Sequence, residues 1–414
     1  MDTLSFLWTN KRFLAFGLMC TLASNFGQTF FIALFGDQFR AEFALSHGDF
    51  GAVYGLATLA SAAVILWAGK LVDRVDLRLF AGAVFLGLAA SAGLLTVANH
   101  VVLMGVAFVG LRLFGQGLLR HTAVVSQARY FEAARGRAMS VVGLGYPIAE
   151  ATFPALVVLV LAAHSWRDAW GGIALYVLVL HLPVAMWMLR GHGERHAELE
   201  RRLKDAEAKS GKVEEPLTQR RILADWRFQL IVPAALMPPF MMTGLFFHQL
   251  AIAGAKGWDI ALLAASFPVF AATSVVSSLL TGWAVDRKGP GRVLPVFVVP
   301  LTAGLMVAGL MDQAFAAPLY LGLGGLSVGA STVLISAAWA ETFGVRHLGA
   351  IRSLTSSMTV LSTALAPVLM GWLLDAGVTV TAILLGAAAL SAMTGVGVLA
   401  PARDLRRLHA PKSH

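Results

Sequence analysis

The feature that most constrains this chain is a succession of long apolar runs separated by short polar segments. A membrane-spanning helix needs about 20 mostly apolar residues. The composition fits such a protein, because 57% of the 414 residues are hydrophobic, only 13% are charged and the mean hydropathy is +0.73. A soluble domain usually carries nearly twice that charged fraction. The sequence therefore predicts an all-α integral membrane protein, with twelve spans near 13–36, 48–69, 79–98, 101–123, 138–163, 169–189, 228–253, 258–284, 293–312, 315–339, 349–374 and 377–400.

A short motif occurs twice in the chain, 213 residues apart. Gly69, Asp73 and Arg74 recur as Gly282, Asp286 and Arg287, and each copy follows a long apolar run. Recurrence at a fixed offset indicates two structural repeats in the same orientation. We expect two pseudo-symmetric six-helix bundles, with this division of the chain: bundle 1–189, charged cytoplasmic linker 190–227, bundle 228–402 and basic cytoplasmic tail 403–414.

The distribution of Lys and Arg predicts the orientation in the membrane. With both termini in the cytoplasm, the opposite face holds only Arg40, Arg167 and Lys256, and the fourth span holds Arg112 and Arg120. The remaining 27 of the 32 cations then lie on the cytoplasmic side, as the positive-inside rule requires. The net charge of +9 is thus explained by topology rather than by nucleic-acid binding. We expect a multi-pass protein of the inner (cytoplasmic) membrane.

Several kinds of site are missing from the sequence. The single cysteine, Cys20, excludes a disulfide framework. The sequence has no phosphate-binding loop of the ATP-driven pumps and no paired His or Cys residues with metal-ligand spacing in the spans. We therefore expect no cofactor, no metal and no enzymatic activity. The expected partners are a small-molecule substrate, protons and the lipid bilayer, with the protein acting as a monomer.

The repeated motif resembles the signature loop of the major facilitator superfamily, which lies between the second and third of twelve spans. The resemblance implies a transporter fold in which two bundles expose a central cavity to each side in turn. In the first copy Asp76 stands where a second glycine is usual. The glycine at 69 is expected to let two helices approach closely, and the charges are expected to pair with acidic groups of the same half. The residues of this conformational latch are Gly69, Asp73, Arg74, Arg78, Gly282, Asp286, Arg287, Glu341 and Arg346.

The fourth and fifth spans carry ionisable residues at depth. Arg112 precedes closely spaced glycines, which resembles the fourth-span motif of the same superfamily. A charge at mid-span costs about 2.5–3.5 kcal/mol on insertion scales, so Arg112 should face the interior and have a partner. Glu150 lies at a similar expected depth in the fifth span. We predict that Arg112 and Glu150 pair and that Glu150 couples transport to protons, since burial favours its neutral form and Arg112 its ionised form.

Further polar residues are expected to line the cavity. Asn25 and Gln28 lie mid-span in the first helix, Gln116 follows Arg112 by four positions, and Tyr146 precedes Glu150. In the seventh span, Pro238 and Pro239 are expected to break the helix, and His248 follows. The predicted substrate-binding residues are therefore Asn25, Gln28, Arg112, Gln116, Tyr146 and His248, with Glu150 and Arg112 as the proton-coupling pair.

The sequence supports a secondary active transporter. A cation in an apolar cavity favours a small organic anion such as a monocarboxylate, moved together with protons. The glycine-rich fifth span is loosely similar to that of the monocarboxylate and oxalate–formate carriers. If Glu150 fully neutralises Arg112, the alternative is proton-driven export of lipophilic or cationic compounds. A third possibility, from another class, is a membrane sensor that transports nothing.

Overall fold

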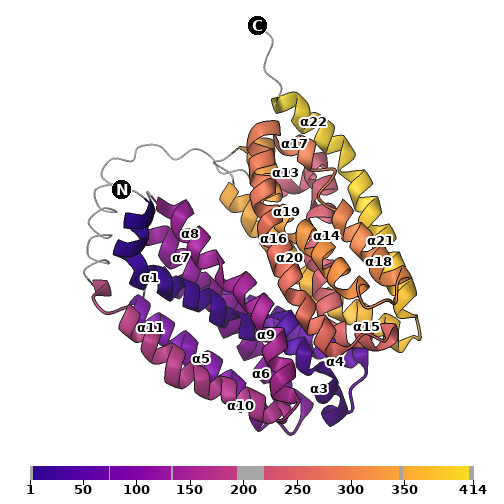
Figure 1. Ribbon diagram of the computed structural model, residues 1–414. Helices are drawn as coiled ribbons and strands as arrows, with labels where there is room; N and C mark the ends of the chain where they lie inside the picture. The colour runs from indigo at the N-terminus through magenta and orange to yellow at the C-terminus, as the bar shows by residue number, and fades with distance from the viewer. Residues whose placement is uncertain (1–2, 74, 132–133, 194–218, 345–347, 410–414) are drawn as a thin grey trace. The chain divides into compact units, whose positions relative to one another are not determined.

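The computed structural model describes residues 3–73, 75–131, 134–193, 219–344 and 348–409, and every regular element in these ranges is helical (Figure 1). Ten of the described helices are long and apolar enough to cross a membrane, and a pair bent by 47° adds an eleventh. A shorter apolar helix, Val299–Leu310, occupies the predicted ninth span. Each of the twelve predicted spans therefore coincides with a helix or with this bent pair.

The first half of the chain is built from helices interrupted by short irregular turns. Its elements are α1 (Thr3–Ala23), η1 (Ser24–Gly27), α2 (Thr29–Ile32), η2 (Ala33–Phe35), α3 (Gly36–Phe43), α4 (His47–Ala68), η3 (Gly69–Asp73), α5 (Leu77–Thr96), α6 (Val101–Gly110), η4 (Leu111–Leu119), α7 (Arg120–Tyr130), α8 (Arg135–Gly143), α9 (Gly145–Leu161), α10 (Trp166–Tyr176), η6 (Val177–His181) and α11 (Leu182–Met188). Two of these, η4 and η6, are π-helical.

The second half contains the longest unbroken helices. Its elements are α13 (Gln219–Ala224), α14 (Trp226–Phe247), α15 (Gln249–Lys256), α16 (Ile260–Lys288), α17 (Pro290–Val293), α18 (Val299–Leu310), α19 (Ala316–Phe343), α20 (Leu348–Asp375), α21 (Val380–Gly397) and α22 (Leu399–His409). The tail expected to begin at residue 403 is thus helical as far as His409. Of the expected linker, 194–218 lies outside the described residues, and α13 falls within its last part.

The chain forms two compact units. The first comprises residues 1–35, 56–149 and 159–214, and the second comprises 36–55, 150–158 and 215–414. Two short segments from the first half of the sequence, 36–55 and 150–158, therefore pack with the second half. The predicted division at 189 and 228 remains a proposal.

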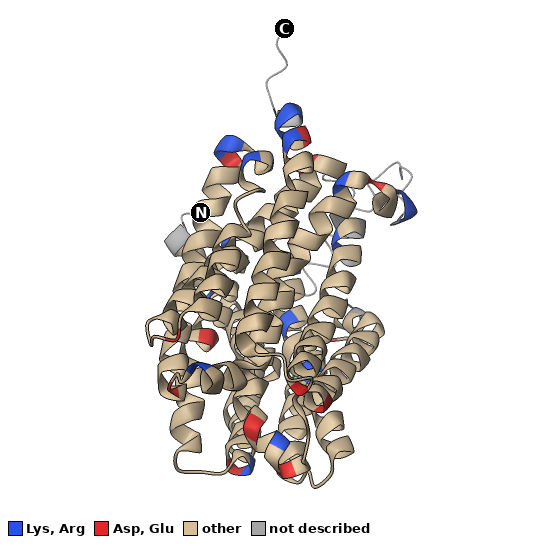
Figure 2. Cartoon of the chain, turned by 90° about the vertical axis from the view of Figure 1, so that its right-hand side faces the viewer, with Lys and Arg blue, Asp and Glu red and all other residues tan. Residues whose placement is uncertain are grey.

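Charged residues gather mostly at the ends of the helices, whereas the lengths between are almost free of them (Figure 2). Large apolar side chains such as Leu66, Leu279 and Met393 are about 70% exposed on these lengths. In water such surfaces would be unfavourable. In a bilayer they face acyl chains, which is the solvent that the composition predicted.

Close helix packing in the second unit depends on small residues. Helices α16 and α19 run along each other over most of their lengths. A Cβ atom at Gly329 would meet the backbone oxygen of Ser274, and one at Gly325 would lie 2.5 Å from the backbone oxygen of Phe270. These two glycines are four residues apart, which is the small-residue spacing that lets membrane helices approach each other. Helix α14 also packs on α19, where the ring centre of Phe228 lies 5.2 Å from that of Trp339.

Candidate functional site

The first span is broken near its middle, and its own polar side chains explain why. The hydroxyl of Ser24 donates to the carbonyl of Thr21 at 2.7 Å, and the amide of Asn25 donates to the same carbonyl at 2.8 Å. Such side chains compete with backbone N–H groups for the helix carbonyls. The α-helix ends at Ala23, four residues follow as a 3₁₀ turn, and Gln28 is extended, with φ −81° and ψ 152°.

The fourth span is irregular where it packs against the break in the first span. Residues Leu111–Leu119 form a π-helix between two α-helical segments, and this stretch contains Arg112, Gly115 and Gln116. π-helical turns within α-helices occur frequently at functional sites. Broken spanning helices likewise border the substrate sites of transporters.

These two irregular segments contact each other through glycines. A Cβ atom at Gly27 would meet the backbone oxygen of Leu111 and would lie 2.7 Å from the backbone nitrogen of Gln116. A Cβ atom at Gly115 would lie 2.9 Å from the Cα of Gly27. The backbones are therefore in direct contact, which leaves no room for a side chain at either position.

Arg112 joins the two segments. Its side chain is buried, with 3% exposed, and its Nη1 donates to the carbonyl oxygen of Gly27 at 3.2 Å. A break in a helix releases carbonyl groups from their usual partners, and a guanidinium supplies donors to such groups. Arg112, which was predicted to face the interior, is thus buried at the break of the first span.

The other cavity residues predicted in the first half lie around the same break. Asn25 is 1% exposed, and its amide oxygen has no hydrogen-bond partner within the described ranges. Gln28 and Gln116 are half-buried on the two irregular segments. Tyr146 lies one residue after Gly145, where a Cβ atom would come within 2.8 Å of the backbone of α1. The guanidinium of Arg120 lies 5.5 Å from the centre of the Tyr146 ring.

Glu150 lies on α9 with Tyr146 and is half-buried. It belongs to the second compact unit, whereas Arg112 belongs to the first. Its pairing with Arg112 therefore stays a prediction.

His248 has a different environment from that of the other predicted substrate residues. It lies at the C-terminal end of α14, and its Nε2 is 2.8 Å from the carbonyl oxygen of Pro367 in α20. Its ring lies 5.7 Å from that of His47, at the start of α4. The break expected at Pro238 and Pro239 is absent, because α14 continues through both prolines to Phe247. The helix ends at Phe247, and His248 is the residue that follows it.

The start of α4 packs tightly on α20 within the second unit. The carboxylate of Asp375 accepts hydrogen bonds from the backbone N–H of His47 at 3.0 Å and of Gly48 at 2.7 Å. A Cβ atom at Gly51 would lie 2.6 Å from the backbone oxygen of Pro367, and one at Gly55 2.7 Å from that of Ala364. A negative charge at a helix N-terminus is favourable. This contact was not predicted from the sequence.

The first copy of the latch motif departs from its expected geometry. A Cβ atom at Gly69 would lie 3.5 Å from the ring of His121, an ordinary contact, so the expected close approach of two helices is not seen there. The nitrogen Nε2 of His121 lies 3.0 Å from the carbonyl oxygen of Gly69. Asp73 lies at the end of η3, and Arg74 lies outside the described residues.

Arg78 bonds locally rather than across the half. Its Nε donates to the carboxylate of Asp76 at 3.2 Å, and its backbone N–H donates to the same carboxylate at 2.8 Å. Asp76 thereby caps the N-terminus of α5. Partial burial alone would raise the pKa of Asp76, but the hydrogen bonds from Arg78 outweigh it and hold that pKa below its usual value.

The second copy of the motif ends α16. Asp286 and Arg287 are exposed, and the guanidinium of Arg287 lies 4.5 Å from the centre of the Trp283 ring. At Gly282 a Cβ atom would meet its first neighbour only at 3.9 Å. Glu341 is half-buried near the end of α19, and Arg346 lies outside the described residues. The latch role of these residues remains a prediction.

The contact at Gly27 makes a sharp prediction about stability. Gly27→Ala should destabilise the protein by about 1–3 kcal/mol, because the added Cβ atom meets backbone atoms that cannot rotate away. The matched control is Gly143→Ala, because no atom lies within 4 Å of a Cβ atom there. That change should be neutral or stabilise by up to about 1 kcal/mol through the unfolded state. Thermal unfolding of the two purified variants measures the difference, and equal midpoints would contradict the packing described here.

Comparisons with known proteins agree with this helical architecture. The sequence model of the Major Facilitator Superfamily matches residues 14–323. A solved structure of a bacterial homologue of the human lysosomal transporter Spinster, inward-facing and unoccupied, has a TM-score of 0.65 at 13% identity, covering 98% of this chain and 99% of that one. The occupied inward-facing form has a TM-score of 0.61 at 15% identity, covering 95% of each chain. A search of curated proteins gave no match.

Proposed function

Because the chain belongs to the Major Facilitator Superfamily, we propose that this transporter moves a small organic anion, such as a monocarboxylate, by alternating access and together with protons. The observation that carries the proposal is the position of Arg112. It is buried in a spanning segment, and it bonds the backbone of a second span where that helix is broken. Ionisable residues inside a membrane are rare and usually serve function.

The chemistry of a guanidinium favours an anion with a carboxylate. The planar group matches two carboxylate oxygens with parallel N–H donors, and such charge-assisted pairs are about twice as strong as neutral hydrogen bonds. Asn25, Gln28 and Gln116, on the same two irregular segments, supply amide groups for the rest of a small polar solute. Tyr146, at the start of α9, adds a phenol.

We propose that the protein lies in the inner membrane. In the proposed orientation both termini are in the cytoplasm. The described cations that support it are those at helix ends, including Arg137 of α8, Arg220 of α13 and Arg403 of α22. Loops rich in Lys and Arg stay in the cytoplasm during insertion. We propose that the protein acts as a monomer.

The direct test is ligand-induced stabilisation of the purified full-length protein. A ligand at 100 times its dissociation constant should stabilise the folded state by about 2.7 kcal/mol. We expect this from a monocarboxylate within a panel that also holds dicarboxylates, amines and lipophilic cations. Stabilisation by the cations alone would favour the exporter, and the absence of both stabilisation and flux in proteoliposomes would favour a sensor.

A further inference from the structure

A cationic pocket lies where α1 and α11 meet, far along α1 from the break at Gly27. It encloses about 200 Å³ and is lined by Thr9 to Phe13 of α1 and by Met188 to His192 at the end of α11. Three of these ten residues, Lys11, Arg12 and Arg190, are basic, and none is acidic. Within the described part of the chain, no ion pair involves any of the three.

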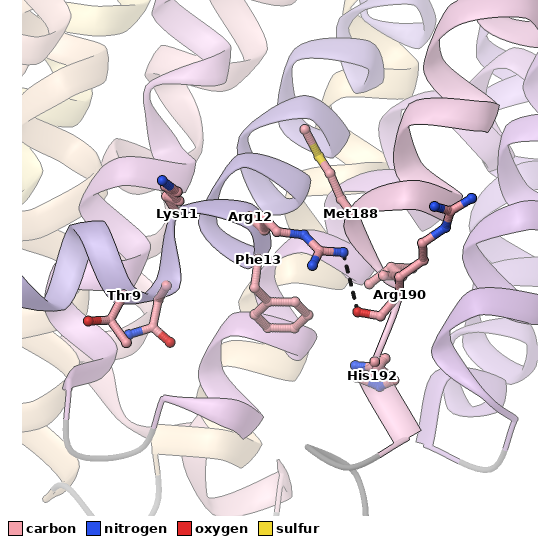
Figure 3. A pocket seen from close by; sticks show the side chains of 10 residues that line it. Thr9, Lys11, Arg12, Phe13, Met188, Arg190 and His192 are labelled. Carbon is pink, nitrogen blue, oxygen red and sulfur yellow. Dashed lines mark hydrogen bonds between the residues drawn. The ribbon is translucent and has the colours of Figure 1, made fainter.

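Hydrogen bonds from Arg12 join the two sides of the pocket. Figure 3 shows the side chain of Arg12 reaching from α1 toward the backbone of Arg190, between Lys11 and the end of α11. The Arg12 guanidinium donates to the carbonyl of Trp187 at 2.6 Å and to that of Arg190 at 3.3 Å. It thereby satisfies carbonyl groups at the C-terminus of α11, where cations are favourable.

Stacked aromatic rings line the base of the pocket. His192 is 4% exposed and stacks on Phe13, with ring centres 5.9 Å apart. The hydroxyl of Tyr130 lies 3.1 Å from Nε2 of His192. A base of this kind holds Lys11 and Arg190 at the rim, where both side chains are exposed.

Two exposed tryptophans flank the cations of the pocket. Trp8 is 74% exposed, and the ammonium of Lys11 lies 3.9 Å from its ring centre. Trp187 is 49% exposed, and Arg12 lies 5.1 Å from its ring centre. Exposed tryptophans are enriched at the membrane interface.

We propose that this pocket binds the phosphate headgroup of an anionic lipid in the leaflet on the side of the N-terminus. Basic pockets between spanning helices on the cytoplasmic side recognise such headgroups. Lys11 and Arg190 contact the phosphate, and Arg12 positions the two helix ends against each other. The bound lipid thereby ties the start of α1, the helix that leads into the break at Gly27, to α11.

The test compares short-chain lipids on the purified full-length protein. Dioctanoyl phosphatidylglycerol is titrated against wild type, the pocket variant Lys11→Gln/Arg190→Gln and the control Arg220→Gln/Arg221→Gln, with bound lipid counted by native mass spectrometry. The control removes two exposed cations from α13, outside the pocket. Each cation near an anionic headgroup contributes about fivefold in affinity, so the pocket variant should bind about 30-fold more weakly. The control should stay close to wild type.

Two further probes separate the lipid from other sources of phosphate. Dioctanoyl phosphatidylcholine, which has no net charge, should bind much more weakly than phosphatidylglycerol. Inorganic phosphate at the same concentration should leave the bound lipid in place. Displacement of the lipid by inorganic phosphate would instead identify a site for soluble anions and overturn the proposal. Equal losses in the pocket and control variants would overturn it as well, since only total charge would then matter.

Discussion

Replacing Arg112 with alanine is expected to weaken binding of the transported anion by a factor of about 30 or more and to reduce transport accordingly. Removing one partner of a buried, hydrogen-bonded charge pair costs about 2–5 kcal/mol, which corresponds to about 30-fold to several thousandfold in affinity. Arg112 is 3% exposed and lies at the break of the first span. The measurement is ligand-induced stabilisation, followed by uptake into proteoliposomes.

The main competing explanation is that Arg112 only holds the two spans together. Losing its hydrogen bond to the Gly27 carbonyl should itself destabilise the protein by about 1–3 kcal/mol. Unfolding of the ligand-free variants measures this effect separately. Arg112→Lys keeps the charge without the planar pair of donors, so it should retain more anion affinity than alanine and less than arginine. If alanine lowers stability but leaves the affinity unchanged, Arg112 is structural and the substrate proposal is wrong.

The features that depend on the lipid environment could be predicted well from the sequence. The spans and the interior position of Arg112 both follow from the energy of placing apolar or charged groups in hydrocarbon, which each segment carries in its own residues. The amide residues Asn25 and Gln116 could be proposed for the same reason, because polar side chains at mid-span are unfavourable wherever they face lipid.

The breaks in the helices were harder to predict. Proline suggested an interruption at Pro238, yet α14 continues through it, as spanning helices can when neighbours satisfy the freed backbone groups. The first span breaks without proline, through the side-chain bonds of Ser24 and Asn25 to the Thr21 carbonyl. A single serine or asparagine in a helix is compatible with either outcome. The outcome at Gly27 depends on contact with Gly115, which lies far along the chain.

Contacts between distant segments explain the other differences. Asp375 caps α4 from 327 residues away, and no local pattern indicates that pairing. Gly69 and Gly282 fit a family motif, yet the space at both would admit a Cβ atom. Gly27, Gly51 and Gly329, which lie outside the two signature loops, are among the glycines whose neighbours leave no such room. Sequence motifs identified the family, whereas the packing depends on tertiary structure.

The second large effect is expected from Glu150→Gln, which should abolish accumulation against a gradient while leaving exchange of anion for anion largely intact. Glu150 is a half-buried carboxyl group in a spanning helix. Glutamine keeps the shape and hydrogen-bonding capacity of the neutral acid but cannot release a proton. A transporter that carries one proton with each monovalent anion moves no net charge, so it can accumulate substrate about tenfold across a difference of one pH unit. In the variant this ratio should fall to about one.

The matched control is Glu341→Gln, which removes a second half-buried carboxyl group, from α19. As a predicted latch residue, Glu341 should affect the rate of transport but not the ratio reached at the end. Proteoliposomes loaded at one pH and diluted into another give both quantities, with radiolabelled substrate inside or outside to follow exchange. Glu150 has no part in proton coupling if its variant still accumulates substrate tenfold. A loss of exchange together with accumulation would place Glu150 in substrate binding instead, because proton release is not needed when anion is exchanged for anion.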